Sequence, residues 1–164
     1  MSDGPVIRPA APSDAGVIWR FIGLLAEYER LSHKMVATEA DIARALFGPA
    51  PRVFADIAEL DGQPVGFSLC FYNFSTFAGR AGIYVEDLFV APQARGRGAG
   101  RALLAHVARR CLDEGLERLD WAVLDWNASA IGVYAKLGAE ALDDWRLRRL
   151  SGQALQALAD DAPP

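Results

Sequence analysis

Apolar and polar residues alternate along this chain in two ways, one typical of strands and the other of helices. Residues 6–8 have the pattern of a short strand, and apolar residues at helical spacing predict a helix that Ser13 caps and that continues to Tyr28. Thr38, with Asp41 three positions later, has the pattern of a capping box and predicts a shorter second helix. This part of the chain therefore predicts a strand followed by two helices.

The middle of the chain predicts a β-hairpin and a further strand. Two stretches rich in β-branched, aromatic and aliphatic residues, 52–60 and 64–74, flank Asp61 and Gly62, and this dipeptide is typical of a tight hairpin turn. Residues 83–90 have the same character and predict the strand that follows.

A helix and a strand are predicted after this point. Apolar residues such as Leu103 and Val107 recur on one face after Gly98 and predict a helix, and residues 118–124 predict a strand.

The last part of the chain begins with a helix that starts at Asn127 and ends near Lys136, with Gly138 in the position of a helix stop. Residues 141–150 predict a last strand or extended segment, and residues 157–164 form a low-complexity tail with a frayed end. Strands with interspersed helices and a central hairpin predict an α/β or α+β domain with a mixed sheet.

Composition places the chain among ordinary globular proteins. Its 164 residues, 52% hydrophobic and 23% charged, predict one domain with a sizeable core over residues 1–164. The net charge of −4 argues against a nucleic-acid surface. The sequence has no pattern of a secretory signal and no apolar run of membrane-spanning length. Cys70 and Cys111 form neither a disulfide framework nor a metal-ligand spacing, so we expect a cytoplasmic enzyme or binding domain without a metal.

A turn rich in glycine and arginine follows the strand at 83–90. Gly96, Gly98 and Gly100 alternate with Arg95 and Arg97 where a helix is predicted to begin. Backbone N–H groups and the helix dipole make such a turn a seat for phosphate, and arginines add charge-assisted hydrogen bonds. The alternative is a solvated turn whose glycines only permit tight geometry.

The spacing of this turn excludes two common nucleotide sites. A P-loop needs Lys and then Ser or Thr after its last glycine, but Gly100 is followed by Arg101 and Ala102. A dinucleotide fold has its G-x-G-x-x-G near the start of its first βαβ unit, whereas the G-x-G-x-G here lies deep in the chain.

Three segments in order carry a resemblance to a known family. Residues 93–98, QARGRG, resemble the acetyl-CoA pyrophosphate loop of the GNAT superfamily of N-acetyltransferases; residues 6–18, VIRPAAPSDAGVI, resemble its first strand and helix, and residues 126–139, WNASAIGVYAKLGA, resemble a later helix. The resemblance implies a single GNAT domain, an acetyl-CoA co-substrate, and a mixed, mostly antiparallel sheet flanked by helices, with acetyl-CoA at a splayed strand pair.

Within the superfamily, the chain is most similar to the diamine (spermidine/spermine) and thialysine N-acetyltransferases. The stretches LAEYE at 25–29 and YVEDLFV at 84–90 add to this likeness, whereas residues 138–145 form a shorter stretch than in that group. The likeness implies a homodimeric acyltransferase that transfers acetyl to the primary amine of a polyamine, diamine or lysine-like acceptor.

Glu86 and Asp87 are candidates for the amine side of the reaction. An alkyl amine has a pKa of about 10.4, so a nearby carboxylate can attract the ammonium and accept its proton. Adjacent residues of a strand face opposite sides of a sheet unless a bulge intervenes, so one acid can face a cleft while the other is structural. The resemblance makes Glu86 the substrate-side acid; the alternative is that both are solvated residues of a sheet edge.

Tyr134 is the candidate general acid. Asn127, Ala130 and Tyr134 share one helical face, and a phenol near the thioester can protonate the departing thiolate. That role for Tyr134 is implied by the resemblance; the alternative is a tyrosine of the core with a satisfied hydroxyl.

The resemblance also implies the remaining contacts. The backbone of the strand end would pair with pantetheine and orient the thioester. The cofactor-binding set is Leu88, Phe89, Val90, Arg95, Gly96, Arg97, Gly98, Ala99, Gly100, Arg101, Asn127, Ala130 and Tyr134. The substrate-binding set is Tyr28, Glu29, Glu86, Asp120, Trp121 and Ala122.

No residue pattern indicates a covalent acetyl-enzyme. The cysteines have the pattern of core residues, and His33 and His106 lack the partners of a Ser-His or Cys-His pair. We therefore expect direct attack in a ternary complex. Two other functions stay open: acetylation of a peptide amino terminus or protein lysine, and acyl-CoA binding without turnover.

Overall fold

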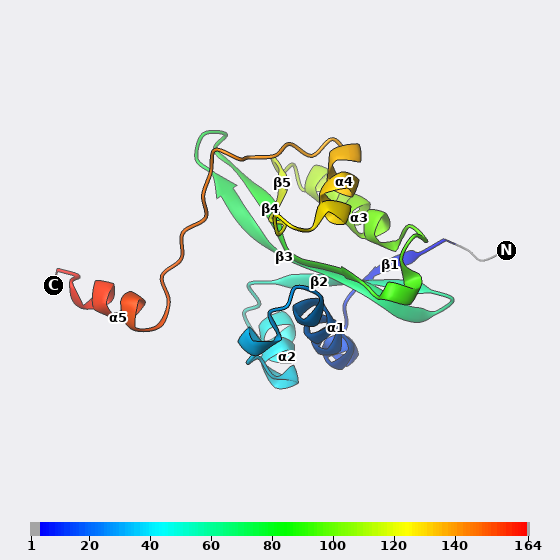
Figure 1. The fold of residues 1–164 in the computed structure, drawn as a ribbon, viewed down its shortest axis with the longest axis horizontal. Coiled ribbons are helices and arrows are strands. Elements are labelled where there is room, and N and C mark those ends of the chain that lie inside the picture. The colour runs from blue at the N-terminus through cyan, green and yellow to red at the C-terminus, as the bar shows by residue number, and fades with distance from the viewer. Residues whose placement is uncertain (1–3, 164) are drawn as a thin grey trace. The chain divides into compact units, whose positions relative to one another are not determined.

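The computed structural model describes residues 4–163. Its chain forms two compact units, residues 1–124 and residues 125–164 (Figure 1). The first unit holds the sheet and three of the α-helices, and the second holds the other two. A single functional domain over residues 1–164 stays a prediction.

The first unit is built on a five-stranded mixed sheet with strand order β1-β2-β3-β4-β5. The strands are β1 Val6–Pro9, β2 Phe54–Leu60, β3 Gln63–Ser75, β4 Arg80–Val90 and β5 Leu119–Trp121. The first four are antiparallel and β5 is parallel to β4. This confirms the predicted mixed, mostly antiparallel sheet.

The β4–β5 pair is short, and the two strands separate early. Their register runs only from Ile83 to Val85 of β4, opposite residues 119–121. β4 continues to Val90, and within the described residues no further pairing with β5 is present. Residues 86–90 therefore have no strand partner on the β5 side, which is the splayed geometry that the resemblance implies.

Helices cover both faces of this sheet. Helix α1 (Ala15–Tyr28) and helix α2 (Glu39–Phe47) lie on one face, and helix α3 (Ala99–Asp113) lies on the other (Figure 1). On the α1 side, Ile18 and Phe21 pack with Phe67 and Phe89 in one apolar cluster. A separate cluster on the α3 side joins residues of α3 to the opposite face of β3 and β4. The sheet is thus buried on both faces.

The predicted hairpin and capping box are confirmed. Asp61 and Gly62 both have positive φ, 51° and 73°, as a tight turn between β2 and β3 requires. The Thr38 backbone N–H donates to Asp41 Oδ2 at 2.9 Å, and the Asp41 N–H donates to Thr38 Oγ1 at 3.2 Å. Both signals act within a few residues of one another, which is why the sequence alone predicts them.

The expected cap at Ser13 is wrong by one residue. Ser13 lies inside a 3₁₀ turn, Pro12–Asp14, and α1 begins after it at Ala15. Asp14 closes this turn because its Oδ2 accepts the Ala11 N–H at 2.7 Å and pairs with Arg8 of β1 at 2.7 Å. The start of α1 thus depends on Arg8, which lies on β1. The spacing of apolar residues along the helix gives no sign of this contact.

The second unit differs more from the prediction. Helix α4 spans Ala128–Lys136, and Gly138 has a φ of 83° after it, as expected of a helix stop. Residues 141–150 form no strand but an extended segment with one turn, which is the second of the two predicted forms. A further helix, α5 (Gly152–Asp160), stands where part of the low-complexity tail was predicted. In the first unit, the predicted strand at 118–124 is shortened to the three residues of β5.

Candidate functional site

A β-bulge decides how the two acids of β4 are placed. Val85 is paired with Cys70 and Asp87 with Leu69, so that Glu86 is the extra residue between two consecutive residues of β3. Leu69 belongs to the apolar cluster on the α1 side, and cross-strand partners share a face. Asp87 therefore faces the α1 side and is half-buried, while Glu86 is exposed at the bulge. The simple alternation of an unbroken strand does not hold at this point.

Three carboxylates come together at this bulge. Burial, and then the charges of Glu86 and Glu29, raise the pKa of Asp87 to about 6. Burial also raises the pKa of Glu29, which directly follows α1. The end of α1 and the bulge of β4 thus form one region of negative potential. A positively charged ligand would relieve the repulsion within it.

Tyr84 and Asp120 extend this region along the β4–β5 pair. Tyr84 is the register partner of Asp120, and burial followed by the charges of Glu86 and Asp120 raises the pKa of Tyr84. The Asp120 carboxylate is already engaged, since its Oδ2 accepts from Asn73 Nδ2 at 2.8 Å and from Arg118 Nε at 2.7 Å. The predicted substrate contact of Asp120 stays a prediction. In the structure its carboxylate joins β5, and the residue that precedes it, to β3.

The other two residues of that predicted set differ in accessibility. Trp121 ends β5 and is half-buried, whereas Ala122 follows the strand and is exposed. Asn73 and Arg118, which hold Asp120, were not predicted. The signal in the sequence that could have pointed to Asn73 is its polar side chain inside the otherwise β-rich stretch 64–74.

The glycine-rich turn has the backbone that a phosphate seat needs. Gly96 and Gly98 have φ values of 76° and 87°, in the left-handed region, and Gly98 is the N-cap of α3. Ideal Cβ atoms at these two positions meet nothing within 4 Å, so the space in front of the turn is open. The first N–H groups of a helix have no partner inside the helix and point toward that space. These residues fit a pyrophosphate.

The arginines of the turn link it to the other parts of the site. Arg95 donates from Nε to the carbonyl of Val90 at 3.1 Å, and its guanidinium lies over the ring of Tyr28 at 5.0 Å. The end of α1, with Tyr28, is therefore held beside the turn. Arg97 forms an exposed ion pair of 3.6 Å with Asp61 in the β2–β3 turn. Arg101 is exposed in the first turn of α3.

The strand residues before the turn have mainly structural side chains. Phe89 is buried on the α1 side, whereas Leu88 and Val90 pack on the α3 side with Ala99 and Leu103. What these strand residues can offer to a ligand is the free backbone of the splayed edge.

Helix α4 of the second unit carries the remaining candidates. The Asn127 side chain caps this helix by accepting the N–H of Ala130 at 3.3 Å. Tyr134 is half-buried and lies two turns further on the same helix. Tyr134 and Glu86 belong to different compact units, so their joint action stays a prediction.

The two cysteine thiols are not placed to act as nucleophiles. Cys70 and Cys111 are both buried, and burial raises the pKa of the Cys70 thiol to about 12. A thiol with such a pKa stays protonated near neutral pH and is a poor nucleophile. Among residues 4–163, no group of three or more His, Cys, Asp or Glu side chains could hold a metal ion. Nor is any helix in this range long and apolar enough to cross a bilayer.

Comparison with known families identifies the fold and the chemistry. The model of the acetyltransferase (GNAT) family matches residues 19–139. The chain belongs to the GNAT acetyltransferase family. It is therefore an acetyltransferase, and GNAT acetyltransferases use acetyl-CoA as co-substrate.

Individual relatives cover almost all of this GNAT chain. The thialysine N-epsilon-acetyltransferase of Bos taurus is 39% identical over 94% of this chain and 96% of its own. The L-ornithine N5-acetyltransferase of Arabidopsis thaliana is 32% identical over 93% of this chain and 86% of its own. Among solved structures, an integron cassette protein from the mobile metagenome of V. cholerae superposes with a TM-score of 0.79, at 27% identity, over 97% of this chain and 99% of that chain.

Proposed function

We propose that this GNAT enzyme transfers acetyl from acetyl-CoA to a primary amine of a small cationic acceptor, by direct attack in a ternary complex. The observation that carries the proposal is the cluster of Glu29, Glu86 and Asp87 at the β4 bulge, next to the splayed edge. A cluster of this charge attracts an ammonium, and attracts one with a second positive charge more strongly. The relatives named for thialysine and L-ornithine are consistent with an acceptor of this class.

The proposed seat of acetyl-CoA follows the end of β4 and the start of α3. The backbone N–H groups of residues 96–101 would bind the pyrophosphate, and Arg95, Arg97 and Arg101 would add positive charge. Arg97 would exchange its ion pair with Asp61 for a phosphate oxygen. The backbone of Leu88, Phe89 and Val90 would pair with pantetheine, with the Val90 carbonyl giving up its hydrogen bond from Arg95. Asn127 and Ala130 would complete the seat. Acetyl-CoA supplies the thioester.

The proposed chemistry divides between two residues. Glu86 accepts a proton from the ammonium, directly or through water, and the free amine then attacks the thioester carbonyl. A backbone N–H of the β4 edge stabilises the oxyanion of the tetrahedral intermediate. The carbon–sulfur bond breaks, Tyr134 protonates the departing thiolate, and the products are an N-acetylated amine and coenzyme A. Tyr28 and Glu29 would hold the far end of the acceptor, with Asp120, Trp121 and Ala122 along β5.

A thiol-release assay with acetyl-CoA tests the acceptor class. We expect thialysine, ornithine, diamines and spermidine to give higher kcat/KM than peptides with a free amino terminus or a single lysine. A preference for peptides would favour the second candidate, acetylation of a peptide amino terminus or protein lysine.

The resemblance to the diamine and thialysine group also leads us to propose a homodimer in the cytoplasm, without a nucleic-acid or membrane partner. Light scattering at working concentration tests the dimer, and a monomer would contradict it.

A further inference from the structure

A second carboxylate is buried on the opposite face of the sheet from the bulge. Asp56 of β2 is 2% exposed and is the cross-strand partner of Ser68 of β3, which is in turn the partner of Leu88. Leu88 packs with Ala99 and Leu103 of α3. Since cross-strand partners share a face, Asp56 points into the layer between the sheet and α3.

This layer contains polar atoms without adequate partners. Asp56 Oδ2 and Ser68 Oγ are buried and have no hydrogen-bond partner among the described residues. Asp56 Oδ1 lies 3.5 Å from Nε2 of His106 on α3. A buried carboxylate without compensation destabilises the fold, so the nearby cations decide what Asp56 contributes. Burial raises the pKa of Asp56, and the charges of His106 and Arg110 act in the opposite direction.

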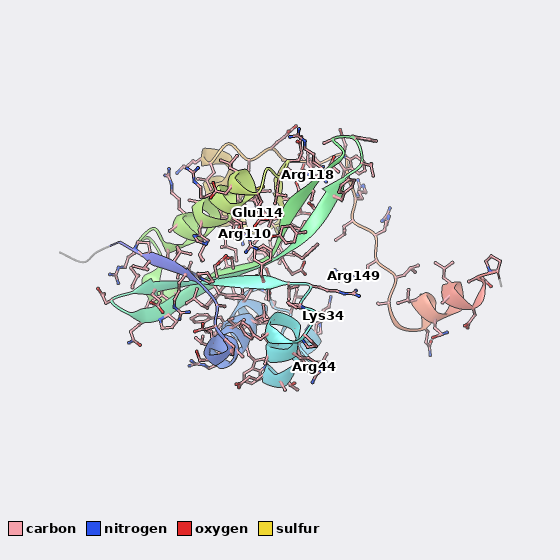
Figure 2. All side chains as sticks on the ribbon, turned by 180° about the vertical axis from the view of Figure 1, so that it is seen from behind. Lys34, Arg44, Arg110, Glu114, Arg118 and Arg149 are labelled. Atoms are coloured by element: carbon pink, nitrogen blue, oxygen red, sulfur yellow. The ribbon has the colours of Figure 1, made fainter. Side chains whose placement is uncertain are left out.

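Arg110 is held by other partners. Its Nε donates to Glu114 Oε1 at 2.7 Å, and Figure 2 labels both residues. Its second terminal nitrogen donates to the Tyr72 hydroxyl at 2.9 Å, and its guanidinium lies over the Phe54 ring at 3.9 Å. These contacts hold Arg110 in place, and it acts on Asp56 through its charge.

The other elements packed against Asp56 bring no further charge. From β3, Cys70 faces it with a thiol whose pKa burial raises to about 12 and which therefore stays neutral. From β1, its register partner is Pro9. His106 is thus the group at contact distance whose charge can change, and its side chain is 37% exposed, so solvent protons reach it.

We propose that His106 and Asp56 are positioning residues that hold α3 against the sheet, and that protonation of His106 strengthens both this hold and the binding of acetyl-CoA. The inference rests on the proposed function, because it takes the turn at Gly98, which begins α3, as the pyrophosphate seat. A shift of α3 moves the N–H groups of that turn.

The sign of the pH dependence follows from the surroundings. An imidazolium compensates the Asp56 carboxylate; as pH rises, the imidazole becomes neutral and leaves the buried carboxylate with the distant charge of Arg110 alone. The raised pKa of Asp56 has the same consequence, because the folded state then binds more protons than the unfolded state above about pH 4. Stability therefore falls as pH rises.

The experiment compares wild type with His106→Gln and His106→Lys at about pH 5.5 and about pH 8.5. Asp113→Asn, an exposed acid on the same helix, is the control. Acetyl-CoA affinity is measured by calorimetry, and stability without ligand by denaturation. We expect His106→Gln to weaken affinity about twofold to tenfold at the lower pH, with almost no effect at the higher pH. We expect His106→Lys, which keeps its charge, to bind equally at both.

The outcomes separate this inference from the proposed function. Equal effects of His106→Gln at both pH values, or an effect no larger than that of Asp113→Asn, would overturn the positioning role while acetyl-CoA binding stands. If wild type binds no acetyl-CoA at either pH, the proposed function and the link to binding both fail. In that case, denaturation without ligand still tests whether His106 holds α3 against the sheet. A loss of stability in His106→Gln only at the lower pH supports this role, and any other result overturns it. If His106→Gln does not fold, an unchanged pH dependence in His106→Lys overturns the inference.

Discussion

Asp87 and Asp56 lie on opposite faces of one sheet, and both are withdrawn from solvent, yet their surroundings carry opposite charge. Burial raises the pKa of each. Around Asp87 the other contributing groups are Glu86 and Glu29, which raise its pKa further. Around Asp56 they are His106 and Arg110, which oppose the rise.

This difference distinguishes a site that can bind a cationic ligand from a contact that supports the fold. The positive groups that act on Asp56 are part of the chain, so the fold itself supplies charge of opposite sign to that carboxylate. The groups that act on Asp87 repel it, and an external cation would lower the electrostatic free energy of the whole cluster. The chain thus supplies positive charge to the buried carboxylate on the α3 side of the sheet, but not to the one on the α1 side. Substitutions that change one face and leave the other intact can test this contrast.

The largest effect is expected from removing the two proposed reacting groups. Tyr134→Phe keeps the ring but removes the proton donated to the thiolate, so kcat should fall about tenfold to several-hundredfold with acetyl-CoA affinity nearly intact. Glu86→Gln should raise KM for the amine, and its effect should shrink as pH rises because free amine becomes abundant. Steady-state kinetics from about pH 7 to about pH 9.5 measure both.

The pH profiles of these two variants carry the test. The Tyr134→Phe loss should not be relieved at high pH, whereas the Glu86→Gln loss should be. Coinciding profiles would show that the proposed division between amine side and thiolate side is wrong. Asp113→Asn, which changes a charge on the far face of the sheet, serves as the control.

A smaller effect, on binding alone, is expected at the glycine turn. Gly98→Val forces a branched residue into a φ of 87° and places side-chain atoms in the open space before the turn. Acetyl-CoA affinity should fall about tenfold or more, because the N–H groups of α3 no longer reach the pyrophosphate. Calorimetry in the presence of a chelator measures this, and binding by wild type should not need magnesium. A folded variant with unchanged affinity would contradict the phosphate seat.

Local sequence signals predicted the elements that depend on neighbouring residues. The Asp61-Gly62 turn, the Thr38–Asp41 box and the glycine turn each act within a few residues, and the structure has the first two as predicted. The bulge at Glu86 was open in the sequence because it depends on the register between β3 and β4. A register results from packing on both faces of a sheet and leaves little trace in one strand.

Contacts between distant elements were the least predictable part of the site. Glu29 and Asp87 are brought together only by the fold, and so are Asp56 and His106. In the sequence, His106 lacks the partner of a Ser-His or Cys-His pair, and in the structure its partner is Asp56 of β2. Helix α5 was missed because its composition, rich in alanine, also fits a disordered tail.

A moderate effect on stability is expected at Asp87. Its folded-state pKa of about 6 lies above an ordinary unfolded value of about 3.9, so the folded state binds more protons between these values and wild-type stability falls as pH rises through this window. Asp87→Asn removes that loss and should stabilise the protein by about 1 to 2 kcal/mol at pH values above 6. Urea denaturation at several pH values measures this, and an unchanged pH slope would contradict the assigned cause.

The smallest effect is expected at the rim of the acidic cluster. Glu29 and Glu27 flank Tyr28 at the end of α1, but Glu29 is half-buried and acts on Asp87, whereas Glu27 is exposed. Glu29→Gln should therefore raise KM for a doubly charged amine about twofold to fivefold, with kcat almost unchanged, because it weakens attraction without removing the reacting group. Glu27→Gln removes the same charge two residues away and should change KM less.

The Glu29→Gln effect should also be smaller with a singly charged amine, since such an acceptor has no second ammonium for Glu29 to attract. Equal KM changes in the two variants, or in the two acceptors, would mean that Glu29 contributes only to the general field of the surface and not to a defined acceptor site.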